Sequence, residues 1–259
     1  MVMNEWVVLY RLFRYDGAVV KKKEKKTVKT TKPFRGLQKK KRPPRRLNVG
    51  AEREKNKGPA NEKVAWKPGN MLYPLPVVLV SCGDLEGEHN LLTVAWTGIL
   101  STDPPFCYIS VRPNRHSFEM IKQHGEFAIN LTNKSLARAT DWCGVRSGKE
   151  LDKFTEMNLT PAPGIQIKAP VVAESPVNLE CVVRETKEMG SHVVFLAEIV
   201  QIQANKEYID EKTGALNLEK AHLIAFSHGK YYELGKRLGN FGYSVEKKKT
   251  KKKRRAARG

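Results

Sequence analysis

The charge of this chain is divided into three blocks, and the division decides which part of it can fold. Residues 1–68 carry 21 Lys and Arg against 6 Asp and Glu, and residues 246–259 carry 9 against 1, so both ends are strongly basic. Residues 69–245 carry 17 against 20 and are close to neutral. A highly charged segment with few apolar residues cannot bury enough surface to offset its ordering entropy. We therefore predict a folded domain at 63–245, a largely disordered basic extension at 1–62 and a basic tail at 246–259.

Neither a signal peptide nor a membrane span is evident. Residues 6–13 are apolar enough for a short amphipathic helix, but Arg11 and Arg14 interrupt any signal-peptide core. No run approaches the roughly 18 apolar residues that a transmembrane helix needs. Four cysteines lie far apart and form no CxxC pair: Cys82, Cys107, Cys143 and Cys181. We expect buried structural thiols in a reducing compartment, in a soluble cytoplasmic protein.

The middle of the chain consists of short apolar runs separated by turns. These runs predict strands at 74–81, 92–101, 106–111, 127–131, 178–187 and 191–204. Helical spacing predicts short helices at 117–124, from Asn133 to about 142, and around 151–157. We expect Ser117 to cap the first helix and Gly125 to end it. In 178–187, period-2 alternation predicts that Cys181 faces inward while Glu180 and Arg184 face outward.

This order of elements favours an antiparallel fold. Many short strands without regularly alternating long helices are typical of a barrel or a sandwich rather than a doubly wound parallel sheet. The usual signatures of other enzyme classes are also missing, because the chain has no GxGxxG, GxxxxGK[ST], HExxH or GxSxG motif. Its six histidines do not pair at ligand spacing, so we expect no metal site. No residue is identified as a catalytic acid or base.

Two segments combine polar and apolar residues in a way that suits a ligand. The first, HNLLTVAWTG, contains Asn90, Thr93, Trp96 and Thr97. A flat apolar wall beside polar groups suits a planar ring, and the following glycine permits close backbone approach. An alternative remains open, in which Trp96 belongs to the core and Asn90 to a turn.

The second segment, VRPNRHS, precedes a predicted helix. Arg112, Arg115 and the Ser117 hydroxyl, beside exposed amides at a helix N-terminus, suit a phosphate. An ordinary capped surface helix explains the same residues. Lys153 and His192 are each compatible with a solvated position or a ligand contact. The aromatic residues of AFSHGKYYELGK form either a packed turn or the lid of a site: Phe226, His228, Tyr231 and Tyr232.

Taken in order, nine strings of the sequence resemble the flavin reductase-like family of FMN-binding split barrels, specifically its flavoredoxin branch. They are MLYPLPVVLVSCGD, NLLTVAWTG, DPPFCYISVRPNRHS, FAINL, ATDWCGVRSG, LDKF, ESPVNLEC, GSHVVFLAEI and FSHGKYYELGK. The resemblance spans about 63–245, and residues 1–60 have no counterpart in it. It implies a mainly β, Greek-key split barrel with a few short helices, FMN held without a covalent bond, and a homodimer with the flavin near the subunit interface.

The resemblance also implies which residues hold the flavin. Six positions match those associated with flavin binding: Asn90, Trp96, Ser117, Lys153, His192 and Phe226. We add their neighbours Thr93, Thr97 and Arg115. In this interpretation Trp96 forms a wall for the flavin, Ser117 contacts the phosphate, and Lys153 supplies a cation to the phosphate or to the reduced ring.

The function expected from the resemblance is that of a flavin-dependent oxidoreductase. Electrons would pass from a reduced nicotinamide, NADH or NADPH, or from a protein donor, through FMN to a protein or small-molecule acceptor. Two alternatives stay open: an electron carrier without nicotinamide activity, and a barrel that only binds flavin or another planar ligand. A further hypothesis concerns the basic ends, whose clustered Lys and Arg are suited to nonspecific contact with nucleic acid.

Overall fold

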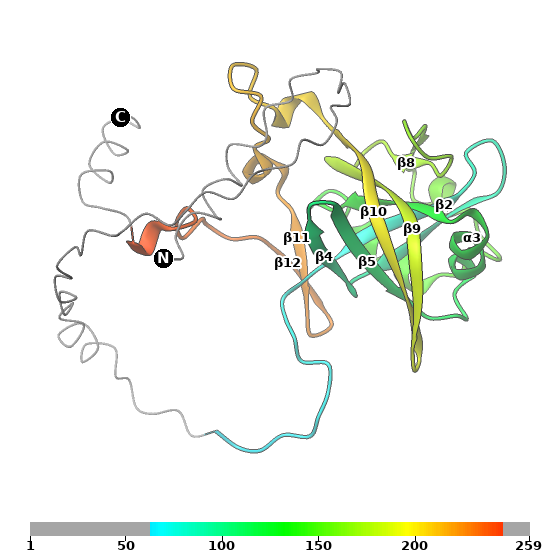
Figure 1. Ribbon diagram of the computed structural model, residues 1–259, viewed down its shortest axis with the longest axis horizontal. Helices are drawn as coiled ribbons and strands as arrows, with labels where there is room; N and C mark the ends of the chain where they lie inside the picture. The colour runs from blue at the N-terminus through cyan, green and yellow to red at the C-terminus, as the bar shows by residue number, and fades with distance from the viewer. Residues whose placement is uncertain (1–62, 246–259) are drawn as a thin grey trace, which may run out of the picture. The chain divides into compact units, whose positions relative to one another are not determined.

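The structure is a computed structural model that describes residues 63–245 (Figure 1). The expectations for residues 1–62 and 246–259, namely disorder, an amphipathic helix and contact with nucleic acid, lie outside the described residues. Within the described part of the chain, no helix combines the length and the apolar character needed to cross a bilayer.

The described residues form a mainly β fold with short helices. The strands are β1 (Leu75–Pro76), β2 (Val78–Gly83), β3 (His89–Val94), β4 (Thr97–Thr102), β5 (Pro105–Val111), β6 (Glu126–Leu131), β7 (Pro161–Ala162), β8 (Val171–Val172), β9 (Val177–Met189), β10 (His192–Ala204), β11 (Ile224–Ser227) and β12 (Lys230–Glu233). The α-helices are α3 (His116–His124), α4 (Ala137–Val145) and α5 (Lys153–Glu156). Short 3-10 helices follow at η1 (Lys206–Tyr208), η2 (Leu218–Ala221) and η3 (Tyr243–Val245).

Seven of these strands form one antiparallel sheet in the order β3-β2-β6-β9-β10-β5-β4. β3 and β4 lie at opposite ends of this order, although only Ala95 and Trp96 separate them in sequence. The sheet must therefore curl until its two ends approach each other at that connection. The predicted antiparallel barrel is confirmed. A small sheet, β1-β11-β12, lies beside β4, and the long strands β9 and β10 cross the front of the barrel (Figure 1).

The main core fills the barrel. Alternate residues of each strand point to the same face, so the inward positions of the curled sheet converge on apolar side chains such as Val80, Ile109, Phe127 and Phe195. A second cluster lies on the other face of β2 and β3, under α4 and α5, and includes Leu79, Leu91, Cys143 and Phe154. All six residues of β2 are buried. Burial on both faces explains why this strand has a continuous apolar sequence.

The predicted strand at 92–101 was wrong in one respect, because it is two strands. β3 ends at Val94 and β4 begins at Thr97. The chain leaves one edge of the sheet and enters the other within two residues. At this break the Trp96 carbonyl is still hydrogen-bonded to β5, because it accepts from the Ser110 amide at 2.9 Å.

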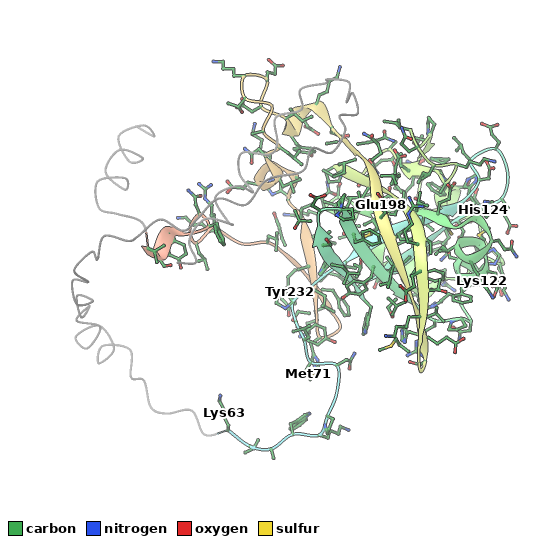
Figure 2. The ribbon with its side chains drawn as sticks, in the orientation of Figure 1. Lys63, Met71, Lys122, His124, Glu198 and Tyr232 are labelled. Carbon is green, nitrogen blue, oxygen red and sulfur yellow. The ribbon has the colours of Figure 1, made fainter. Side chains whose placement is uncertain are left out.

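The predicted cap of α3 was half right. Gly125 ends the helix in a left-handed conformation, with φ of 68° and its amide bonded to the Ile121 carbonyl at 2.9 Å. Arg115, not Ser117, occupies the N-cap position. Ser117 lies inside the first turn and is 1% exposed, because its hydroxyl contacts a barrel residue instead of the helix amides. Lys122 and His124 lie on the exposed side of this helix (Figure 2).

The outward position predicted for Glu180 was wrong, since this residue of β9 is 0% exposed. Its carboxylate accepts hydrogen bonds from the amides of Ile165 and Gln166 and from the Gln203 side chain. The segment around 163–172 covers the outer face of β9 at this point, so both faces of the strand are buried. Arg184 is exposed as predicted and pairs with Glu198 at 2.7 Å.

All four cysteines are buried and free, as expected. Two of them meet in the barrel core, where the sulfur atoms of Cys107 and Cys181 are 3.6 Å apart. These residues lie on β5 and β9, with β10 between them. Two strand spacings amount to roughly 9.5 Å, whereas a disulfide needs α-carbons within about 7 Å. The contact is therefore one between two thiols.

Candidate functional site

Two adjoining cavities open beside the break between β3 and β4. The larger measures about 520 Å³ and the smaller about 340 Å³. Four residues line both cavities: Leu92, Arg112, Arg115 and Val145. The walls come from β3, β5, the start of α3, the end of α4 and, in the smaller cavity, the β11–β12 hairpin. The two cavities thus form one elongated site with two chemically different ends.

The larger cavity is cationic. Its basic side chains are Arg112, Arg115, Arg146 and Lys153. Among the described residues no Asp or Glu lines it. It also lies at the N-terminal turn of α3, where the helix dipole and free amides favour negative charge. This end of the site is suited to an anion.

Lys153 is the most unusual of these cations, because it is 3% exposed. Its ammonium donates to the Leu91 carbonyl at 2.9 Å and to the Cys143 carbonyl at 2.8 Å, so it joins β3 to the last turn of α4. Within the described chain it has no carboxylate partner at ion-pair distance. Burial, with a smaller contribution from the charge of Arg115, lowers the pKa of Lys153. A buried charge without a counter-charge is costly unless a ligand supplies one.

Two buried polar side chains complete this end of the site. Asn90 is 5% exposed, and its amide nitrogen donates to the Ser117 hydroxyl oxygen at 2.8 Å. Both side chains line the larger cavity. Because Asn90 supplies the donor in this bond, the proton of the Ser117 hydroxyl is left for another acceptor.

The smaller cavity is largely apolar and aromatic. Trp96 is 39% exposed and faces His192, with the two ring planes 15° apart and the centroids separated by 6.4 Å. Val77, Val111 and Phe226 add apolar surface. Burial, and then the charge of Arg112, lower the pKa of His192, so its ring is neutral at pH 7. Parallel rings and aliphatic walls of this kind suit a planar aromatic ligand.

The far side of the smaller cavity contains a tyrosine and a carboxylate. Tyr231 is paired with Phe226 across the β11–β12 hairpin, and their ring centroids are 5.6 Å apart. Burial, together with the nearby Asp141 of α4, raises the pKa of Tyr231 to about 12. The phenol is therefore protonated at neutral pH. The sequence left Tyr231 as a packed turn residue or a lid, and nothing in it indicated Asp141.

The structure brings together eight of the nine residues proposed from the sequence. Those that line the larger cavity are Asn90, Arg115, Ser117 and Lys153. Those that line the smaller one are Thr93, Trp96, Arg115, His192 and Phe226. Thr97 lies outside both cavities: it is 6% exposed, and its hydroxyl donates to the Tyr108 carbonyl at 2.6 Å.

The sequence missed part of the turn after α4. Arg146, Ser147 and Gly148 line the larger cavity, although no helix or strand contains them. The string ATDWCGVRSG includes these positions, but the family resemblance implied no role for them. Their proximity to Asn90 and Ser117 depends on tertiary packing, which no local pattern encodes.

An antiparallel split barrel that joins a cationic cavity to an aromatic one defines a class, that of split-barrel flavoproteins. Residues 70–235 match the model of the family described as the flavin reductase like domain. This chain belongs to the flavin reductase-like family, and within it to the flavoredoxin branch.

Solved structures and a curated relative agree with this placement. The flavoredoxin of Desulfovibrio vulgaris (Miyazaki F) superposes with a TM-score of 0.66 at 27% identity, covering 71% of this chain and 100% of that one. The flavoredoxin from Methanosarcina acetivorans gives a TM-score of 0.65 at 26% identity, with the same coverage. The NADH-dependent flavin reductase StyB of Pseudomonas fluorescens is 25% identical over 140 residues, 53% of this chain and 76% of that one. A flavin cofactor and flavin-related redox chemistry follow from the family.

Proposed function

We propose that this protein binds FMN without a covalent bond and uses it to transfer electrons from a donor to an acceptor. The phosphate would occupy the cationic cavity and the ring system the aromatic cavity. The observation that carries this proposal is the buried ammonium of Lys153, which faces the cationic cavity and has no carboxylate partner among the described residues.

Charge favours a phosphate ester at this position. A phosphate monoester carries about −1.5 to −2 charges at neutral pH, and its oxygens accept several hydrogen bonds. Lys153, Arg115 and the Ser117 hydroxyl all line the cavity and can donate such bonds. The bound anion would supply the counter-charge that the buried ammonium lacks.

The residues of the aromatic cavity have a different task. Bound flavin supplies the redox chemistry, because its ring accepts and releases electrons in one- or two-electron steps. Trp96 and His192 would exclude water from that ring and hold it by stacking. Arg112 and Arg115, which line both cavities, would supply positive charge near a bound ring and so favour its anionic reduced form.

For the donor, we propose a reduced nicotinamide, with a protein donor as the alternative. The similarity to an NADH-dependent flavin reductase supports the first, and the similarity to two flavoredoxins supports the second. In the first case the enzyme is a flavin reductase-type oxidoreductase. In the second the protein is an electron carrier without nicotinamide activity.

The visible spectrum of the purified protein tests both the binding of FMN and the identity of the electron donor. We expect a yellow protein, or a colourless one that becomes yellow when reconstituted with FMN, and bleaching by NADH or NADPH. Bleaching by dithionite alone would favour the carrier. A protein that retains no FMN after reconstitution would contradict the proposal as a whole.

We further propose that the protein forms a homodimer. Apolar side chains are exposed on the edge strand β4 and in the segments that precede β1 and follow β12. They include Leu72, Ile99, Leu100, Leu238 and Phe241, at 53% to 93%. Contiguous exposed apolar surface is typical of an interface. Light scattering coupled to size exclusion should give twice the mass of the chain, and a monomer at micromolar concentration would contradict this proposal.

A further inference from the structure

The turn that follows α4 closes one side of the cationic cavity. Its residues Arg146, Ser147 and Gly148 all line that cavity. The hydrogen bonds of the turn are local, from the Arg146 amide to the Trp142 carbonyl and from the Lys149 amide to the Ser147 hydroxyl. They fix the shape of the turn but do not attach it to β3.

The contact with β3 is made at Gly148. A β-carbon at this position would lie 2.5 Å from both Cγ and Nδ2 of Asn90, and real β-carbons do not approach heavy atoms so closely. The backbone of the turn therefore lies directly against the Asn90 amide group. Only glycine permits this approach, and the reason is space, because φ at Gly148 is not in the left-handed region.

The Asn90 amide has little freedom to move away. It is 5% exposed and is held between the turn and Ser117, to whose hydroxyl it donates at 2.8 Å. A side chain at position 148 would have to displace either the amide or the turn. Displacement of the amide breaks the bond that orients the Ser117 hydroxyl, and displacement of the turn moves Arg146 on the cavity wall.

We propose that Gly148 is a positioning residue for the anion-binding end of the site. Because Gly148 has no side chain, the turn can lie against the Asn90 amide and keep it hydrogen-bonded to Ser117. This arrangement determines which polar groups face a phosphate. The inference rests on the proposed function, since it assumes that the phosphate of a flavin occupies the cationic cavity. Gly148 acts through Asn90, the side chain that it lies against.

The test compares FMN with riboflavin, which has the same ring but no phosphate. Flavin fluorescence titrations of Gly148→Ala should show a loss of FMN affinity of about tenfold, the size expected when one buried hydrogen bond is broken. Riboflavin affinity should be unchanged. Gly235→Ala is the matched control, because a β-carbon there meets nothing within 4 Å and φ is ordinary. It should bind both flavins like the wild type.

A double-mutant cycle tests whether the effect passes through Asn90. In an Asn90→Ala background the three atoms that a new β-carbon would meet are absent, so Gly148→Ala should cause little further loss of FMN affinity. The Asn90→Ala substitution also removes the clash. The double variant can therefore still be measured if Gly148→Ala alone folds poorly. Additive losses in the double variant would overturn the inference.

The titrations also separate a failure of the role of Gly148 from a failure of FMN binding. Wild-type FMN affinity in Gly148→Ala, or an equal loss for riboflavin, would overturn the role of Gly148 while leaving FMN binding itself intact. Failure of the wild-type protein to bind FMN would instead contradict the proposed function. The two failures are therefore distinguishable.

Discussion

At the scale of single residues, Lys153 connects the stability of the fold to the proposed ligand. Lys153→Met keeps the length of the side chain but removes the charge and the two hydrogen bonds to carbonyls. We expect FMN affinity to fall by at least about tenfold, as for loss of a charged hydrogen bond. Fluorescence titration measures this, with the exposed neighbour Lys149→Met as the control. Equal losses in the two variants would remove Lys153 from the site.

The titration of Lys153 should appear in the pH dependence of binding. Its pKa in the free protein is lowered by burial and by Arg115, and a bound anion would raise it again. FMN affinity should therefore be full below the free-protein pKa and decline as the pH rises through it, at a lower pH than for an ordinary lysine near 10.4. The phosphate titrates near pH 6 and does not contribute there. Riboflavin affinity over the same range is the control, and a parallel decline would contradict this assignment.

The cysteines should be chemically silent in the folded protein. All four are buried, and burial raises the pKa of Cys82 and of Cys143 to about 11, so neither is a thiolate at neutral pH. We expect a thiol reagent to modify none of them in native buffer and all four after denaturation in guanidinium. Rapid modification of the native protein, or a disulfide detected by mass spectrometry, would contradict the structure.

Local patterns identified some site residues but not their surroundings. Trp96 and the arginines of VRPNRHS interrupt strand-like sequence, so they were visible as candidates, and the family resemblance added Lys153. Gly148 was not visible, because a glycine in a turn has many ordinary explanations. Its significance depends on Asn90, which is 58 positions away and meets it only in the folded barrel.

At the scale of elements, the buried carboxylate of Glu180 attaches the 163–172 segment to β9. Glu180→Ala would leave the amides of Ile165 and Gln166 without their acceptor in a covered position. We expect a loss of about 3 kcal/mol in the free energy of unfolding, because these bonds involve a charged acceptor. Urea denaturation measures it. Glu185→Ala, exposed on the same strand, should be nearly neutral, and similar losses for both would contradict the anchoring role.

Most strands were predictable, because period-2 patterns and continuous apolar runs reflect burial on one face or two. The errors arose where a second layer changed the environment. Glu180 follows the alternation of a strand with one solvated face, yet the 163–172 segment covers that face. The break at Ala95 and Trp96 has no proline or glycine to indicate it, since closure of the barrel and not local propensity turns the chain there.

At the scale of the whole molecule, ligand binding and folding should be linked. A ligand that binds only the folded state at about 100 times its Kd adds about 2.7 kcal/mol of stability. For a domain of this size, that corresponds to a rise in melting temperature of about 5 to 10 °C. Differential scanning calorimetry with FMN should show such a shift, and riboflavin at the same concentration should produce a smaller one. Equal shifts would mean that the cationic cavity adds nothing to binding.

The position of Trp96 has a kinetic consequence. The sheet has two unpaired margins, on β3 and β4, and Trp96 lies where the chain passes from one to the other. A planar ligand that enters the site beside Trp96 would not have to separate any pair of hydrogen-bonded strands. The core around Phe127 and Phe195 could remain closed during loading and release. We therefore expect the exchange of free and bound flavin to be fast compared with global unfolding, so that the holoprotein can be emptied and refilled without denaturant.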